Sequence, residues 1–285
     1  MITKAAIGPL TQGTIFSCAL AEDYVDCVVH GLIITARCDV TNDKVDVYNY
    51  IPIVKFDDWL VREGVRALAG RTSRSAMGEM RNTLTQLGLA ASILTTTPHN
   101  EVFRIIFDAD DASSKISSKR EQFVKHARRY EAAGKCMQPV PPIAAANALL
   151  TLEKAEAGKL VKELCSNAIA EAYYLPGVGP QEERAGYVAL LREIRHIPRG
   201  LAKAVANGLD RPSYAALQAT DSRCGDRLYI PDDDFAWPTG LLQSPFIEHL
   251  MQRLTLLFSR IGVSDVNEAT VKRLQNRIPA PSGDE

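Results

Sequence analysis

The stretch VVHGLIITARCDVTNDKVDVYNYIPIV, residues Val28–Val54, decides how the fold of this chain is interpreted. With the preceding TQGTIFSCAL, Thr11–Leu20, it contains three apolar or β-branched runs separated by polar turns. Short runs of this kind are typical of β-strands. We expect strands over residues 14–20, 28–36 and 45–54. The second strand should be buried on both faces, because its apolar character is nearly continuous.

Helical periodicity dominates the rest of the chain. We expect helices over residues 57–89, 117–134, 143–175, 182–208 and 245–261. The third and fourth are long enough to pack as an antiparallel hairpin. Residues 101–107 and 227–231 are strand candidates, because they are rich in β-branched and aromatic side chains. Pro52 cannot donate to a ladder and is expected at an edge or at a strand end.

These elements predict an α+β protein, in which a small N-terminal β-barrel is elaborated by helices and followed by a mostly helical C-terminal part. The proline-rich CMQPVPP, residues 136–142, is the best candidate for a boundary. We therefore expect a barrel with a helical insertion over residues 1–135 and a helical region with one short strand over 142–278. Residues 279–285 are expected to form a disordered tail.

Composition excludes several classes of protein. A net charge of −1 argues against general coating of nucleic acid, although local basic patches remain compatible with it. The six cysteines form no CxxC pair and have no zinc-finger spacing, which indicates free thiols and a cytoplasmic location. No run is apolar enough for a signal peptide or a membrane span. We expect no metal and no cofactor. The acidic residues at 108–111 and 232–234 are expected to form turns rather than a magnesium site.

Weak catalytic candidates are His30, Cys38 and Asp39. A thiol after a buried strand is a nucleophile when a neighbouring base deprotonates it. His30 and Cys38 are eight residues apart, about 26 Å along an extended strand, so they form a dyad only if the chain bends between them. The alternative for Cys38-Asp39 is a buried thiol with a carboxylate that orders the next turn. His30 is either a structural histidine or an acid–base group at a barrel mouth.

Two basic clusters are candidates for binding phosphates. The candidate nucleic-acid-binding residues are Lys119, Arg120, Lys125, Arg128, Arg129, Arg62 and Arg66. Basic residues repeated along a helix can follow a phosphate backbone, and neighbouring aromatic rings can stack on bases. The alternative is a solvated or partner-facing basic surface. The regular apolar face of helix 245–261 is expected to be core, or to contact a partner or a second copy.

Several short motifs carry a resemblance to known proteins: Gly13–Phe16, Leu32–Thr35, Cys38-Asp39, Ile51–Val54, Ser244-Pro245 and Arg260–Gly262. The layout of the N-terminal motifs resembles the start of the small β-barrels of the PemK/MazF toxin family. The motifs also resemble those of uncharacterised bacterial proteins with a Gly-x-Ile-Phe start, a Cys-Asp pair and a Ser-Pro-initiated C-terminal helix. The resemblance implies a barrel with a groove for RNA or an inhibitory peptide. Toxins of the family have Arg-Pro before the second strand and Ser or Thr after the third. Here His30-Gly31 and Val54 take those places, so cleavage by that mechanism is not expected.

Three hypotheses follow. The first is a bacterial cytoplasmic accessory or adaptor protein that binds a protein partner or nucleic acid. The resemblance places such a protein in a stress-response, toxin–antitoxin-like or antiviral defence system. The second is a toxin-like nuclease, with His30, Cys38 and Asp39 at the barrel mouth and basic helices guiding the phosphate backbone. The third is a structural subunit whose C-terminal helix docks onto a larger enzyme. No hypothesis involves a membrane.

Overall fold

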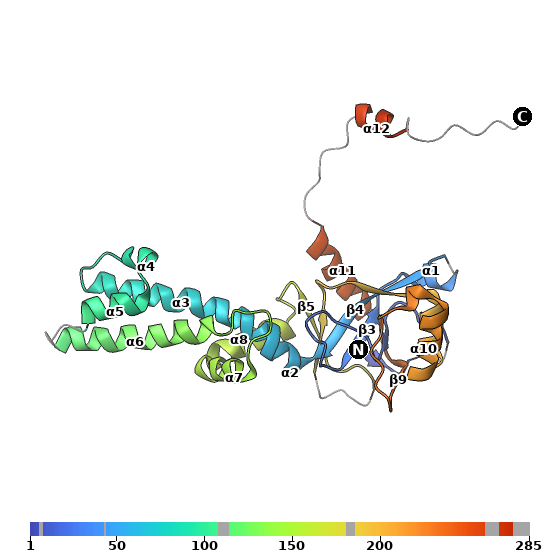
Figure 1. The fold of residues 1–285 in the computed structure, drawn as a ribbon, viewed down its shortest axis with the longest axis horizontal. Helices are drawn as coiled ribbons and strands as arrows, with labels where there is room; N and C mark the ends of the chain where they lie inside the picture. Colours follow the sequence, from blue (N-terminus) through green and yellow to red (C-terminus); the bar gives the residue numbers. More distant parts are fainter. Residues whose placement is uncertain (6–7, 43, 108–113, 181–185, 260–267, 276–285) are drawn as a thin grey trace, which may run out of the picture.

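The computed structural model describes residues 1–5, 8–42, 44–107, 114–180, 186–259 and 268–275. It combines an antiparallel sheet, curled into a half-barrel, with a long helical arm that projects from one side (Figure 1). The sheet runs in the order β1-β10-β2-β3-β4-β6-β5, and β7 also pairs with β4. Its strands are β1 Ile2–Thr3, β2 Thr14–Phe16, β3 Val29–Ile33, β4 Val47–Lys55, β5 Ala172–Leu175, β6 Tyr187–Leu190, β7 Arg195–Pro198 and β10 Pro238–Leu242.

The longest strand, β4, organises the sheet. One edge pairs with β3, and the other pairs first with β7 at residues 47–50 and then with β6 at residues 53–55. Pro52 was expected at an edge or a strand end, but it lies inside β4. It sits where β4 passes from one partner to the next, so neither ladder needs the N–H that proline lacks.

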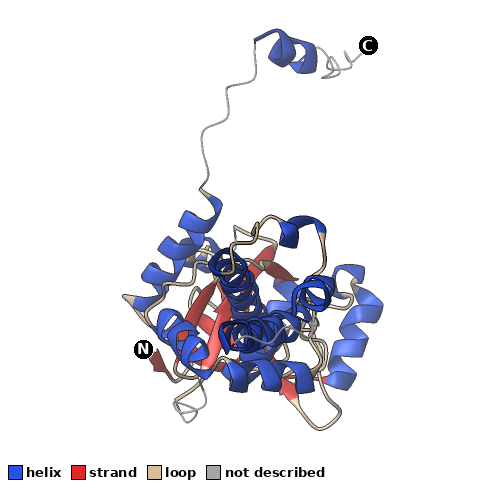
Figure 2. Cartoon of the chain, turned by 90° about the vertical axis from the view of Figure 1, so that its left-hand side faces the viewer, coloured by secondary structure: helices blue, strands red, loops and turns tan. Residues whose placement is uncertain are grey.

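Both faces of the sheet are covered, as Figure 2 shows. Side chains alternate between two apolar clusters, so that Tyr50 and Val54 of β4 join one cluster while Ile51 and Ile53 join the other. Every residue of β3 is buried, which confirms the prediction of a strand buried on both faces. Helix α11, Phe246–Phe258, packs its apolar stripe on the second cluster.

One close approach inside the sheet depends on glycine. Gly31 of β3 lies beside the rings of Phe16 and Tyr50, which form an edge-to-face pair 5.3 Å apart. A Cβ atom at this position would overlap the Phe16 ring and would lie 3.0 Å from the Tyr50 ring. The ring pair therefore requires a residue without a side chain in the strand facing it.

The arm continues directly from β4. Its helices are α2 Phe56–Trp59, the π-helical turn η1 Leu60–Gly64, α3 Val65–Gln86, α4 Ile93–Thr96, α5 His99–Phe107 and α6 Ser114–Gly134. Helices α3 and α6 pack side by side along the arm (Figure 1). The outer part of the arm has an apolar cluster of its own, which includes Met80, Val102 and Phe123. The arm is thus a small helical unit carried by the central strand.

The remaining helices are α1 Arg37–Thr41, α7 Ile143–Leu152, α8 Lys154–Cys165, α9 Arg199–Ala206, α10 Arg211–Thr220, the 3₁₀ turn η2 Ser222–Cys224, and α12 Glu268–Gln275. Strands β8 Leu209–Asp210 and β9 Phe235–Ala236 form a separate pair. Within the described residues, no helix is both long and apolar enough to cross a membrane.

The expected helical hairpin over residues 143–175 and 182–208 is wrong. These segments contain α7, α8 and α9, but also β5, β6 and β7, which join the sheet of the N-terminal strands. Buried apolar runs of four residues carry no periodicity that separates a strand from a helix, and burial against β4 decides the outcome. Strands from both sides of residues 136–142 therefore share one sheet.

The two strand candidates were also wrong. Residues 101–107 belong to α5, because Phe103 and Phe107, one helical turn apart, pack on Phe123 with ring centroids 6.2 and 5.4 Å away. Residues 227–231 pair in no described ladder, although Tyr229 N–H donates to the carbonyl of Cys18 at 3.0 Å. The expected strand at 28–36 ends at Ile33, and that at 14–20 ends at Phe16.

The C-terminal helix confirms the expected element but not its start. It begins at Phe246, after Pro245, and has no side-chain cap from Ser244. Its expected end at Gly262 and the expected tail at 279–285 lie outside the described residues. Ile247, Leu250 and Leu254 are buried in the second apolar cluster, so the inner face of this helix is core.

Candidate nucleic-acid interface

The arm concentrates positive charge. Helices α3 and α6 together carry ten lysine and arginine residues against three glutamates, whereas the whole chain has a net charge of −1. The apolar positions of α6, such as Phe123 and Ala133, are buried, which leaves the charged positions on the outside. The amphipathic pattern that folds the arm thereby also sorts its cations onto the surface.

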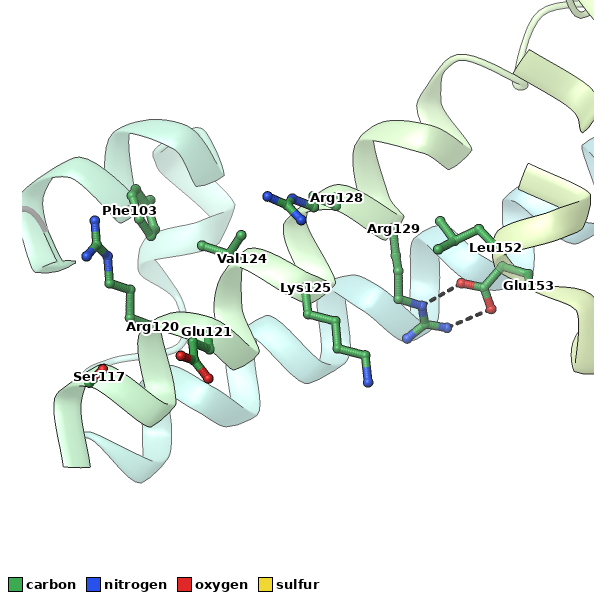
Figure 3. A pocket seen from close by; sticks show the side chains of 10 residues that line it. All are labelled: Phe103, Ser117, Arg120, Glu121, Val124, Lys125, Arg128, Arg129, Leu152 and Glu153. Carbon is green, nitrogen blue, oxygen red and sulfur yellow. Dashed lines mark hydrogen bonds and ion pairs between the residues drawn. The ribbon is translucent and has the colours of Figure 1, made fainter. Parts of the chain in front are cut away.

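A groove of about 790 Å³ runs along α6 (Figure 3). Its lining includes Arg120, Lys125 and Arg128, all exposed, and these were predicted as nucleic-acid-binding residues. Arg120 lies over the Phe103 ring, with its guanidinium carbon 5.5 Å from the ring centroid. Lys125 and Arg128 make no hydrogen bond or ion pair with a described residue. We use the name α6 basic face for these three groove-lining side chains, Arg120, Lys125 and Arg128; in Figure 3, Arg120 and Arg128 point to one side of α6 and Lys125 points to the other.

Arg129 has a different environment from its neighbours. It donates from Nε to Glu153 Oε1 at 2.5 Å and from Nη2 to Oε2 at 3.0 Å, the pair drawn as dashed lines in Figure 3. The Glu153 side chain is only 6% exposed, and its hydrogen bonds raise the pKa of Arg129. A bidentate pair with a buried carboxylate fixes the junction of α6 with α7 and α8. Arg129 therefore has a structural role, although it borders the groove.

The other predicted cations lie elsewhere on the arm. Arg62 lies over the Tyr24 ring at 5.1 Å and donates to the Asp23 carbonyl, so it connects the arm to the half-barrel. Arg66 lies at the root of the arm, where it lines a separate cavity. Lys119 donates to Gln86 of α3 and to Gln122 at 3.0 Å. The seven predicted residues are therefore divided among several environments, and three form the α6 basic face.

A second basic patch was not among the predicted binding residues. Arg74 and Arg81 of α3 are exposed and line a hollow of about 420 Å³ together with Tyr130 of α6. Their spacing of seven residues places both on one face of α3, and this spacing was the available signal. The hollow combines two cations with an aromatic ring, as single-stranded nucleic acid requires.

A pocket of about 1210 Å³, larger than the groove of α6 and the hollow beside Tyr130, lies at the mouth of the half-barrel. His30 and Lys55 line it, together with apolar side chains that are more than half exposed. These exposed side chains are Val25, Val28, Tyr229 and Trp237. His30 itself is 6% exposed, and its ring packs edge-to-face on Tyr187 at 5.8 Å. Tyr229 and Trp237 were not predicted as site residues, because only the fold brings these loop residues to the segment after β2.

Cys38 and Asp39 are in a different place. They belong to α1, Cys38 is exposed, and its Sγ lies 3.7 Å from Asp39 Oδ1. The expectation of a buried thiol at a strand end is therefore wrong, because β3 stops earlier and a short helix follows. Neither residue is among those that line the pocket with His30.

Two cysteines, Cys18 and Cys27, line that pocket. Cys18 is buried and has a positive φ of 63°, an uncommon conformation for a residue other than glycine. Its Sγ lies 3.5 Å from the Phe235 carbonyl. Burial raises the pKa of Cys18 to about 11, so the thiol stays protonated at neutral pH and is a poor nucleophile.

No group of three or more His, Cys, Asp or Glu side chains that could hold a metal ion occurs within the described residues. The chemistry on offer is electrostatic on the arm and amphipathic at the half-barrel mouth. Comparison of the chain with protein-family models, curated proteins and solved structures found no match.

Proposed function

We propose that this protein is a bacterial cytoplasmic accessory protein that binds nucleic acid through the basic faces of its helical arm. The observation that supports this proposal is the α6 basic face, where exposed Arg120, Lys125 and Arg128 border one groove. Neither Lys125 nor Arg128 forms an ion pair with a carboxylate of a described residue, so the positive charge of both side chains faces solvent. Surface cations of this kind bind phosphates by releasing condensed counterions.

The geometry suits a phosphate backbone. Residues 120 and 128 are eight positions apart, which is about 12 Å along a helix at a rise of 1.5 Å per residue. This length corresponds to a few successive phosphates of one strand, so each cation can neutralise about one phosphate. The guanidinium plane of Arg120, which lies over the Phe103 ring, offers a surface on which a base can stack.

Binding by the arm leaves the half-barrel for a second partner. The exposed apolar side chains around its mouth, such as Tyr229 and Trp237, favour a protein partner there. An arm that holds nucleic acid and a barrel that holds a protein would make this chain an adaptor. Its setting in a stress-response or defence system rests on the resemblance to toxin-type barrels.

The test is fluorescence anisotropy with labelled 20-nucleotide single-stranded RNA, single-stranded DNA and duplex DNA. We expect the triple charge reversal Arg120→Glu, Lys125→Glu and Arg128→Glu to abolish binding. The matched control is Lys203→Glu on α9 of the half-barrel, which should bind as the unmodified protein does. Equal affinity of the triple variant and the unmodified protein for all three probes would contradict the proposal.

A second candidate is a toxin-like nuclease, favoured by the presence of His30 and Lys55 in the pocket at the half-barrel mouth. In this alternative, His30 exchanges a proton, and the arm guides the RNA. Expression should then arrest growth, and His30→Ala should relieve the arrest. His196→Ala is the matched control, because this exposed histidine of β7 does not line the pocket. If the unmodified protein neither arrests growth nor cleaves RNA, this candidate is wrong.

A further inference from the structure

A fourth cavity, of about 330 Å³, lies at the root of the arm. It forms where the beginning of α3 meets α8, the segment before β5 and the turn after β6. It shares no lining residue with the groove of α6 or with the pocket at the half-barrel mouth. Three arginines line it, Arg66 and Arg71 from α3 and Arg192 from the turn.

Two of these guanidinium groups are held by carboxylates. Arg71 donates to both oxygens of Glu163, at 2.8 and 2.5 Å. Arg192 lies with its Nη2 2.9 Å from Glu63 Oε1. Each contact fixes the orientation of an arginine and leaves some of its five N–H donors unused. Glu171 also lines the cavity, but it is exposed to solvent.

Arg66 differs from the other two arginines. Its one hydrogen bond to a described residue is a long contact of 3.5 Å from Nη1 to the Pro139 carbonyl. No carboxylate of a described residue lies within 4 Å of it to form an ion pair. The residue is half-buried, so part of its hydration shell is lost as well. Glu63, which also lines the cavity, attracts Arg66 electrostatically, but it is ion-paired with Arg192. The guanidinium group of Arg66 therefore still gains from an anion that enters the cavity.

The rest of the wall is largely apolar and aromatic. Its members are Trp59, Ala67, Met137, Leu160, Ile169 and Ala172. A volume of this size lies at the lower end of the range for small-molecule sites, about 300–1,000 Å³. An apolar wall with convergent cations selects a ligand that has both an apolar body and a charged head.

We propose that the arm-root cavity binds a small organic oxyanion, a phosphate or carboxylate group attached to an apolar or aromatic body. The oxyanion lies against Arg66 and takes the unused donors of Arg71 and Arg192. The body lies on Met137 and Leu160. Such a ligand would bridge the arm and the half-barrel, because its contacts come from both.

Trp59 provides a direct readout. It lines the cavity and is 2% exposed, and the chain contains only one other tryptophan, Trp237. In the full-length Trp237→Phe variant, fluorescence therefore reports on Trp59 alone. We would titrate this variant with phenyl phosphate, with benzoate and with the neutral phenol. Calorimetric titration of the unmodified protein with the same three compounds provides a second measurement that does not depend on the substitution.

We expect saturable binding of phenyl phosphate, of benzoate or of both, and weaker binding of phenol. The two anions together show whether the site prefers a phosphate or a carboxylate. Arg66→Ala should weaken anion binding by about tenfold or more, as the loss of a charge-assisted hydrogen bond predicts. Arg104→Ala on α5, an exposed arginine that does not line this cavity, should leave it unchanged. Absence of saturation by either anion, equal binding of phenol, or unchanged binding by Arg66→Ala would overturn the proposal.

Discussion

The salt dependence of nucleic-acid binding measures how many cations of the arm contact phosphates. If the α6 basic face alone makes the contacts, about three phosphates are neutralised. The slope of log K against log salt should then be about −2.7 for duplex DNA and about −2.1 for a single strand. A slope of −2.7 corresponds to a loss of about 40-fold in affinity between 50 and 200 mM salt.

The perturbation is the removal of one cation at a time. Lys125→Ala and Arg128→Ala should each make the slope shallower by about 0.9 for duplex DNA, because each removes one phosphate contact. Arg129→Ala is not a suitable member of this series, since its pair with Glu153 is structural. The assay is anisotropy at four or five salt concentrations with a fixed labelled probe.

The result that would refute the reasoning is a slope that does not respond to Lys125→Ala or Arg128→Ala. A slope near −4.5 for duplex DNA would mean about five contacts. In that case Arg74→Ala and Arg81→Ala on α3 should each make the slope of log K against log salt shallower. The same measurements thus distinguish binding by one face of the arm from binding by two.

Three further predictions concern the stability of the fold. Gly31→Ala should lower the free energy of unfolding by about 1–3 kcal/mol, because the added Cβ would overlap an aromatic ring. Urea denaturation measures this loss. The control is Gly158→Ala, whose Cβ would meet nothing within 4 Å and which should not be destabilising. Glu153→Gln should lower the free energy of unfolding by about 1–3 kcal/mol by weakening a buried ion pair, whereas Glu163→Gln in an exposed pair should lower it by less than about 1 kcal/mol. Equal losses of stability in the two variants would contradict the structural role of the buried pair. Burial raises the pKa of Glu63, so the folded state binds the proton of this carboxyl group more tightly than the unfolded state does. This contribution to stability is complete below the ordinary carboxyl pKa and is lost as pH rises through the raised pKa of the folded state. The stability of the unmodified protein relative to Glu63→Gln, measured by thermal denaturation, should therefore fall as pH rises above the ordinary carboxyl pKa, and a rise would show that the direction of the shift is wrong.

Sequence patterns predicted those parts of the fold in which local and tertiary preferences agree. The buried strand β3 and the C-terminal helix α11 were expected, because continuous apolar character and strong helical periodicity specify them. Strands β5, β6 and β7 were predicted as helix, since runs of only four residues become strands by pairing with β4 and with one another.

The candidate interface shows the same division. Basic residues of α6 could be placed on a helix surface from spacing alone, and three of them border one groove. The commitment of Arg129 to a buried carboxylate could not be foreseen, because Glu153 is 24 positions away in sequence. The half-barrel pocket, with Tyr229 beside the segment after β2, depends on pairings across more than 200 residues, for which no local signal exists.

The position of the arm within the chain has a consequence for the order of folding. Helices α3 to α6 pack mainly on one another, within residues 65–134, whereas Ser17, just after β2, bonds to Trp237, 220 positions later. Local contacts form fast, and long loops must close before distant strands can pair. On the ribosome, the helices of the arm should therefore pack together before β10, the partner of the N-terminal strands, has been synthesised. During synthesis the first strands would carry an unpaired edge, which chaperones have to protect until the last third of the chain emerges.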